Sequence, residues 1–532
     1  MKRFFATLIV LAIAAAACGG SSSDDNGAGA DDAGSDSATS DDAGSDDSGT
    51  TTDDSSEAAD GAAAEPGEGG GGAEQGLVAE LGLPECPVGA HLDAEGVVEI
   101  DFWHPYTSLT EEAMEDVAAA FNNSQDKINV TVEAQGTYGE LLSKYRESIN
   151  FDSLPAVAII DGQAFRDTVD SGTVLPAQSC VEADDFSLDN IDEVVRSFYS
   201  LDGALYPASM TVSTPVLYYN RTHFEDAGLD PDVPPRTLAE VAEMAAAIQG
   251  AGVSSTPVSL LMQGWFVDTW LTGAGVELVN ANNGRAGNAT EATFNDGPEA
   301  NEIYTLLRDM NEDGLITAFS NTPGQLSHYL AVAGEEASMV IETSTAATTV
   351  SGVLGGTANL SELADAGIEG IDTAAIDDLR LDIDAAPLPG LTEPGKVFIS
   401  GGAVYMTNSG SEAEMAAAWE FMKFMSLVES QKTIHLKGSY LPISPEVLND
   451  PEVQLVWEND AAGRWLATAH GQFEAIDPAF SGPAVGPFTE QRDIMNTSLE
   501  ELLLAGGIPT EVLQGASDEL TEALEAYADA NF

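Results

Sequence analysis

Short apolar runs alternate with amphipathic segments from Gly96 onward, and this alternation constrains the fold more than any other feature of the chain. Ser108 and Glu111 predict a capping box at the start of the first helix of this set. Strands and helices that alternate at this spacing predict βαβ units around a largely parallel sheet. The predicted elements are strands at 97–104, 128–135 and 156–160, and helices at 108–121 and 138–149.

A second alternating set begins near residue 214, where Thr237 and Glu240 predict another capping box. Two such sets predict an α/β protein with two lobes, whose ligand sites lie at the carboxyl ends of strands. We expect lobe 1 to comprise 77–210 and 338–400, and lobe 2 to comprise 211–337 and 401–532. The predicted elements of this part are strands near 257–262, 337–343, 381–389 and 401–407, and helices at 237–249, 266–272, 297–311, 412–427, 493–504 and 509–530.

The first residues have the pattern of an export signal. Lys2 and Arg3 precede an apolar stretch at 4–17, which is too short to span a membrane. Small residues directly before Cys18 resemble the lipobox of bacterial lipoproteins, in which that cysteine becomes the lipidated first residue of the mature chain. Ordinary cleavage near an Ala-x-Ala site is the alternative. We therefore expect a signal peptide at 1–17 and an exported protein, at the cell surface or in the periplasm, held by a lipid at Cys18.

An acidic tether is predicted for 18–76, because this segment has almost only small and acidic residues and cannot bury enough apolar surface to fold. The whole chain has 18 Lys and Arg residues against 89 Asp and Glu residues, a formal net charge of −71. Nucleic-acid binding is excluded, since it needs a basic surface. The remaining chain is long enough for two separate cores.

The sequence shows no motif that indicates a catalytic site. The segment GLTEPGK at 390–396 has the spacing of a phosphate-binding loop, but Val397 stands where such loops have Ser or Thr. Metal-protease, Cys-x-x-Cys and Gly-x-Ser-x-Gly patterns are absent from the sequence, so we expect neither an enzyme nor a cofactor or metal. Cys86 and Cys180 could form one disulfide in an oxidising compartment, and the sequence leaves this open.

Several short motifs in the folded part resemble the extracellular solute-binding proteins of ABC importers, and within them the Ugp-type glycerol 3-phosphate-binding branch. The resemblance extends from about residue 98 to the C-terminus. The motifs are STPVLYYN at 213–220, AGLDPDVPPRTLAEV at 227–241, DFWH at 101–104, QGW at 263–265, ISGGA at 399–403 and GSYLPIS at 438–444.

This resemblance implies a two-lobed periplasmic-binding-protein (Venus flytrap) fold, with hinge crossovers between lobes that close on a ligand. Tyr218 and Tyr219 are expected to pack in the core. The residues that correspond to ligand contacts of the family are Tyr138, Ser213, Trp265, Thr343, Gly402, Tyr440 and Arg492, and Ser344 is the hydroxyl next to Thr343. For Trp265, packing in the core of lobe 2 is the alternative.

Arg492 is the residue expected to meet a phosphate, because a guanidinium can bind two oxygen atoms at once. Two positions depart from the branch. Met262 stands where the glycerol 3-phosphate binders have a second tryptophan, and its flexible side chain leaves room for a larger head group. Gly162 replaces a contacting glutamate, so that Asp161 is the nearest carboxylate.

We therefore expect a monomeric binding protein for glycerol 3-phosphate or a glycerophosphodiester that delivers it to ABC permease subunits. The first alternative is the same scaffold binding a neutral oligosaccharide through aromatic stacking and carboxylates. The second alternative, from another class, is an exported hydrolase, which would need a metal or nucleophile site.

Overall fold

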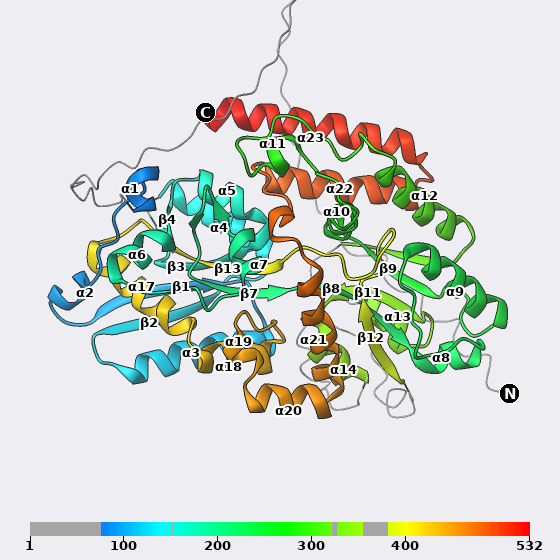
Figure 1. Ribbon diagram of the computed structural model, residues 1–532, viewed down its shortest axis with the longest axis horizontal. Coiled ribbons are helices and arrows are strands. Elements are labelled where there is room, and N and C mark those ends of the chain that lie inside the picture. Colours follow the sequence, from blue (N-terminus) through cyan, green and yellow to red (C-terminus); the bar gives the residue numbers. More distant parts are fainter. Residues whose placement is uncertain (1–75, 152, 322–326, 355–380, 532) are drawn as a thin grey trace, which may run out of the picture. The chain divides into compact units, whose positions relative to one another are not determined.

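The computed structural model describes residues 76–151, 153–321, 327–354 and 381–531 (Figure 1). The expected signal peptide, Cys18 and the acidic tether up to residue 75 lie outside the described residues. Among the described helices, none is both long enough and apolar enough to cross a membrane. The described residues belong to one folded unit, which contains two large sheets.

The first sheet has the strand order β2-β1-β3-β13-β4, and β7 also pairs with β13. The strands β1, β2 and β3 are parallel, as the alternating pattern predicts, whereas β13 runs antiparallel to β3. Helices α3, α4 and α17 pack on these strands. The bounds are β1 Val98–His104, β2 Ile128–Ala134, β3 Val157–Asp161, β4 Val174–Leu175, β7 Ser209–Ser213, β13 Ser400–Thr407, α3 Ser108–Ser124, α4 Tyr138–Ile149 and α17 Glu412–Met425.

The second sheet has the strand order β10-β9-β11-β8-β12. The strands β9, β10 and β11 are parallel, and β8 is antiparallel to its neighbours β11 and β12. Helices α10 and α12 both pack on α22, and α22 packs on β9. The bounds are β8 Pro215–Asn220, β9 Val258–Met262, β10 Ile316–Ser320, β11 Met339–Thr343, β12 Ile383–Pro387, α10 Gly264–Gly273, α12 Glu299–Glu312 and α22 Phe488–Leu503.

Shorter helices and connecting elements complete the described chain. Helix α23 packs along α22 and α12, and the two last helices lie side by side in Figure 1. The remaining bounds are α1 Leu77–Leu81, α2 Ala90–Asp93, α5 Phe165–Asp170, α6 Ala177–Asp184, α7 Glu193–Phe198, α8 Arg221–Asp226, α9 Leu238–Ala251, α11 Asn280–Asn283, α13 Ser327–Ala333, α14 Ala346–Leu354, α18 Val428–Gly438, α19 Pro445–Leu448, α20 Pro451–Asn459, α21 Ala461–Gly471, α23 Pro509–Asn531, the 3-10 turns Gly162–Ala164, Gln472–Ala475 and Pro478–Phe480, and the short strands β5 Ser200–Leu201 and β6 Ala204–Leu205.

Strand pairing differs from the lobe boundaries expected from the sequence. The segment 338–400 was expected in lobe 1, but β11 and β12 pair with β8 in the second sheet. The segment 401–532 was expected in lobe 2, but β13 pairs with β3 and β7 in the first sheet. An apolar run indicates that a strand is buried. It does not indicate which sheet the strand joins, because the strand with which it pairs lies far away in the sequence. The chain passes between the sheets from β7 to β8 and again from β12 to β13, which are the expected crossovers.

Of the two predicted capping boxes, one forms in half and the other does not form. The Thr237 side chain accepts a hydrogen bond from the Glu240 N–H at 3.2 Å, but the Glu240 side chain accepts from the Arg236 N–H at 2.6 Å and not from the Thr237 N–H. At α3 the prediction is wrong, because Ser108 is already inside the helix with a φ of 54° and Thr107 precedes it without a side-chain cap. A left-handed backbone at Ser108 directs the chain away from the geometry that a capping serine needs.

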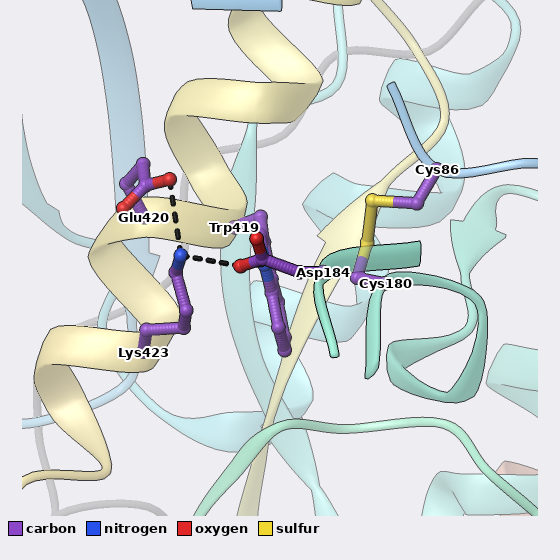
Figure 2. Close-up of a disulfide and its surroundings, with 6 residues drawn as sticks. All are labelled: Cys86, Cys180, Asp184, Trp419, Glu420 and Lys423. Carbon is purple, nitrogen blue, oxygen red and sulfur yellow. Dashed lines mark hydrogen bonds and ion pairs between the residues drawn. A yellow bond between two sulfur atoms is a disulfide. The ribbon is translucent and has the colours of Figure 1, made fainter. Parts of the chain in front are cut away.

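A disulfide joins Cys86 to Cys180, with the two Cα atoms 4.9 Å apart (Figure 2). Cys180 lies on α6, and the same helix is tied to α17 by Asp184. The Asp184 carboxylate accepts a hydrogen bond from Trp419 Nε1 at 2.9 Å and pairs with Lys423 Nζ at 2.5 Å. The bond therefore attaches the N-terminal segment of the described fold to the helices of the first sheet.

Replacing both cysteines by serine is expected to lower the free energy of unfolding by about 3–5 kcal/mol. The bond closes a loop with a sequence separation of 94, which restricts the unfolded chain. Urea unfolding of the variant and of the wild-type protein measures the difference. A single Cys86→Ser variant should lose a similar amount, and an unchanged midpoint in both variants would contradict the prediction.

Candidate ligand-binding site

Polar and aromatic residues gather where strands of the two sheets end. Asp161 is the last residue of β3 in the first sheet. Met262 and Thr343 are the last residues of β9 and β11, which are neighbouring parallel strands of the second sheet. Ligands of open α/β sheets bind at the carboxyl ends of strands, so these positions define the candidate site.

Three tyrosines form a hydrogen-bonded group on the first-sheet side, which we call the tyrosine cluster: Tyr106, Tyr138 and Tyr440. Tyr138 Oη lies 2.9 Å from Tyr106 Oη and 3.3 Å from Tyr440 Oη. Tyr106 Oη also lies 2.6 Å from Thr211 Oγ1 on β7. Burial raises the pKa of all three phenols, so they remain neutral donors and acceptors at physiological pH.

Gly402 lies directly beside the tyrosine cluster. It pairs with Asp161 across the sheet, and a Cβ at this position would lie 2.7 Å from Tyr138 Oη and 2.6 Å from Ile159 Cγ2. Real Cβ atoms do not approach other atoms so closely. Glycine at 402 therefore allows the Tyr138 hydroxyl to reach the backbone of β13, as a close-approach role requires.

Arg492 reaches the same region from α22. Its guanidinium donates a hydrogen bond to Gln163 Oε1, and the Gln163 N–H donates to Asp161 Oδ1 at 2.9 Å. The centre of the guanidinium lies 5.0 Å from the centroid of the Phe488 ring. Arg492 Nε is buried and has no hydrogen-bond partner among the described residues.

Two carboxyl groups interact with Arg492, the half-buried Asp161 and the buried Asp268. Burial raises the pKa of Asp161, and the nearby Arg492 charge opposes this shift. Asp268, on α10, is only 1 % exposed, and burial raises its pKa to about 6 against the opposing influence of Arg492. Its Oδ2 accepts a hydrogen bond from Gln491 Nε2 at 2.8 Å, while its Oδ1 has no partner in the described part of the chain.

The second-sheet side contributes Met262 and Trp265, which are both buried. Helix α10, which carries Trp265, is held to α22 by a hydrogen bond of 2.7 Å from the Gly264 N–H to Asn496 Oδ1. Trp265 Nε1 is buried without a partner within the described ranges. A donor in this state at the edge of a site is available to a ligand acceptor.

The hydroxyl residues from the sequence prediction lie at the crossover. Ser344 Oγ accepts a hydrogen bond from the Thr214 N–H at 3.3 Å, and Thr343 Oγ1 accepts one from Thr345 Oγ1 at 3.2 Å. Ser213 ends β7 opposite Ser400, whose hydroxyl donates to the Ser213 carbonyl at 2.9 Å. These contacts align the crossover strands with the strand ends.

Tyr218 and Tyr219 are buried in β8, as predicted. The Tyr218 hydroxyl donates to the Thr343 carbonyl at 3.2 Å, and the Tyr219 hydroxyl donates to the Pro231 carbonyl at 2.9 Å. Tyr218 therefore supports the end of β11 from within the core, whereas Tyr219 holds the segment between α8 and α9.

The model of the bacterial extracellular solute-binding proteins matches residues 116–462, which is more than half of the chain. The chain belongs to this family. It is 24% identical over 439 residues to the sn-glycerol-3-phosphate-binding periplasmic protein UgpB of Pectobacterium atrosepticum, covering 82% of this chain and 93% of that protein.

Two solved structures show the fold of this solute-binding protein. The cyclic alpha-maltosyl-1,6-maltose binding protein from Arthrobacter globiformis has a TM-score of 0.62 and 20% identity, covering 81% of this chain and 100% of that chain. UgpB from Mycobacterium tuberculosis in complex with glycerophosphocholine has a TM-score of 0.60 and 17% identity, covering 81% of this chain and 99% of that chain. The two-lobed fold expected from the sequence is confirmed.

Sequence reasoning missed four residues of this site: Tyr106, Gln163, Thr211 and Asp268. Two of them had a usable signal. Tyr106 follows the predicted first strand within two residues, which places it at a carboxyl end, and Asp268 lies one helical turn after Trp265. In so acidic a chain, however, one more aspartate carries no signal of its own.

Replacing Gly402 by alanine is expected to lower the free energy of unfolding by about 1–3 kcal/mol, because the added methyl group overpacks the contact with Tyr138 and Ile159. Gly139→Ala is the matched control. A Cβ at Gly139 meets open space, and α4 should gain roughly 0.5–1 kcal/mol there. Urea unfolding measures both, and equal effects would contradict the steric argument.

Asp268→Asn is expected to stabilise the protein at pH 8 and to leave its stability unchanged below about pH 4. A carboxyl group whose folded-state pKa is raised favours folding below its unfolded-state pKa, and this contribution is lost as the pH rises through the folded-state value, here about 6. The rise from 3.8 to about 6 corresponds to about 3 kcal/mol. Unfolding at both pH values tests this, and a difference that is independent of pH would contradict it.

Proposed function

We propose that this chain is the substrate-binding subunit of an ABC importer and holds glycerol 3-phosphate or a glycerophosphodiester between its two lobes. The observation that carries the proposal is the half-buried side chain of Arg492, whose Nε is buried and lacks a partner among the described residues, between Gln163 after β3 and Asp268 on α10. The names of the relatives support the choice of ligand, since they include sn-glycerol-3-phosphate and glycerophosphocholine.

Arg492 fits a phosphate because its planar guanidinium can donate two parallel hydrogen bonds to one oxyanion. At present it donates to the neutral Gln163 amide, which is a weaker acceptor than a phosphate oxygen. The tyrosine cluster supplies neutral hydroxyl donors, which add hydrogen bonds without adding charge. We propose that Tyr138, Tyr440, Arg492 and the backbone at Gly402 contact the phosphoglycerol unit.

Asp161 takes the place of the family's glutamate in this proposal. A side chain cannot be accommodated at Gly162, because a Cβ there would lie 2.3 Å from Tyr199 Oη. The neighbouring Asp161 faces Gly402 across the sheet and interacts electrostatically with Tyr106 and Tyr440. Its carboxylate is therefore positioned to accept hydrogen bonds from glycerol hydroxyls.

Met262 and Trp265 form the other side of the proposed site. Trp265 offers an aromatic face and its unpartnered Nε1, and Met262 offers a flexible apolar wall. Thr343, Ser344 and Ser213 line the crossover at the same strand ends. The larger head group of a glycerophosphodiester suits this side.

Delivery to permease subunits requires capture and release, and no covalent chemistry. Ligand contacts to both lobes shift the equilibrium toward the closed state by their differential binding energy. We further propose that the protein acts as an exported monomer attached to the membrane by a lipid on Cys18, with 18–76 as the connecting segment.

A neutral oligosaccharide is the second candidate ligand. It is favoured by the fold of the maltose-type binding protein and by the aromatic side chains at the strand ends. In that case stacking on Trp265 and on the tyrosine cluster would dominate, and Arg492 would contribute little.

Arg492→Ala is expected to weaken binding of glycerol 3-phosphate or glycerophosphocholine by more than tenfold, because the charge-assisted hydrogen bonds to the phosphate are lost. Calorimetry measures the affinity after a thermal-shift panel has compared these ligands with maltose, since a bound ligand raises the melting temperature. Arg464→Ala removes the same charge from an exposed position on α21 and should bind as the wild-type protein does. Stabilisation by maltose alone would reject the phosphate ligand.

A further inference from the structure

Arg492 is the cation of the proposed site, and two carboxyl groups act on it, the half-buried Asp161 and the buried Asp268. Asp161 approaches from the first sheet through Gln163, and Asp268 approaches from α10 on the second-sheet side. Both aspartates interact electrostatically with Arg492. When both are ionised, these three groups carry one negative charge in excess, which is an unusual surrounding for an anion.

Asp268 is placed to act on whatever Arg492 binds. It is 1 % exposed, and its Oδ1 lacks a hydrogen-bond partner among the described residues. Gln491 and Arg492 on α22 face Asp268, and so does Tyr304 on α12. The Tyr304 hydroxyl lies 2.6 Å from Ser498 Oγ. Arg492 is therefore the only cation among the groups that act on Asp268 in the described structure.

The charge of the ligand then decides how tightly the site binds it. A phosphate monoester has its second pKa near roughly 6, so it carries almost two negative charges at pH 8. A phosphodiester has no second proton to lose and carries one. In a water-poor site, like charges disfavour each other strongly, and the additional charge of the monoester meets the ionised carboxylates.

We propose that Asp268 makes this site prefer a monoanionic phosphodiester to a dianionic phosphomonoester. The inference rests on the proposed function and narrows its ligand class. Asp268 accepts a hydrogen bond from Gln491 and acts electrostatically on Arg492, so it can determine specificity without touching the ligand.

The preference should depend on pH in a defined direction. Burial raises the pKa of Asp268 to about 6, so that its carboxyl is largely neutral at pH 5 and ionised at pH 8. The monoester changes from one to two negative charges over the same range. The ionisation of Asp268 and the second negative charge of the monoester both weaken monoester binding at high pH. Diester binding is weakened only by the ionisation of Asp268.

The test compares glycerol 3-phosphate with its methyl diester, sn-glycerol 3-(methyl phosphate), which carries no cationic head group. Calorimetry on the full chain at pH 5 and pH 8 gives the ratio of the two affinities. We expect the preference of the wild-type protein for the diester to increase by about tenfold from pH 5 to pH 8. In Asp268→Asn this increase should fall by about half or more on the logarithmic scale, while Glu243→Gln, on the exposed side of α9, should behave as the wild-type protein does.

A second measurement on the wild-type protein does not depend on any variant. Calorimetry at pH 7 in two buffers with different ionisation enthalpies counts the protons taken up on binding. The monoester should take up more protons than the diester, by up to about one, because only the monoester can gain a proton on its phosphate as well as at Asp268. Equal uptake for both esters, or an affinity ratio that Asp268→Asn leaves unchanged, overturns the inference alone, whereas failure of both esters to bind overturns the proposed function.

Discussion

A single extended segment belongs to both sheets, and the position of every other element depends on it. β7 pairs with β13 in the first sheet, and two residues later β8 lies between β11 and β12 in the second. Every residue of both strands is buried. Because a strand must satisfy its backbone groups through its neighbours, this segment fixes where the two sheets meet, and their strand ends converge beside it.

Charge inside the site follows different rules from charge on the surface. The chain carries a formal net charge of −71, but salt screens the interactions between exposed charges that lie more than about 10 Å apart. Buried groups are screened far less, so under the proposed function the balance among Arg492, Asp161 and Asp268 would govern which anion binds. The tyrosine cluster adds donors without changing that balance, because burial keeps its phenols neutral.

The alternating pattern predicted the local elements well, because the spacing of apolar residues that distinguishes strands from helices depends only on residues close in sequence. The predicted helix at 138–149 coincides with α4, and the first three predicted strands coincide with β1, β2 and β3. Sheet membership of β11, β12 and β13 was wrong, since it depends on distant pairing. In the site, the family resemblance selected Tyr138, Gly402, Tyr440 and Arg492, which lie near one another or share Asp161 as a neighbour. It did not select Asp268, whose importance comes from burial and appears only in three dimensions.

The disulfide between Cys86 and Cys180 has a mechanical consequence. It fastens the start of the described chain to α6, where the Val78 N–H also donates to Glu182 Oε1 at 3.3 Å. If the chain ahead of residue 76 is attached to a membrane, as we propose, a load on it would reach the half of the protein built on the first sheet first. The half built on the second sheet would receive that load through the elements that join the two sheets.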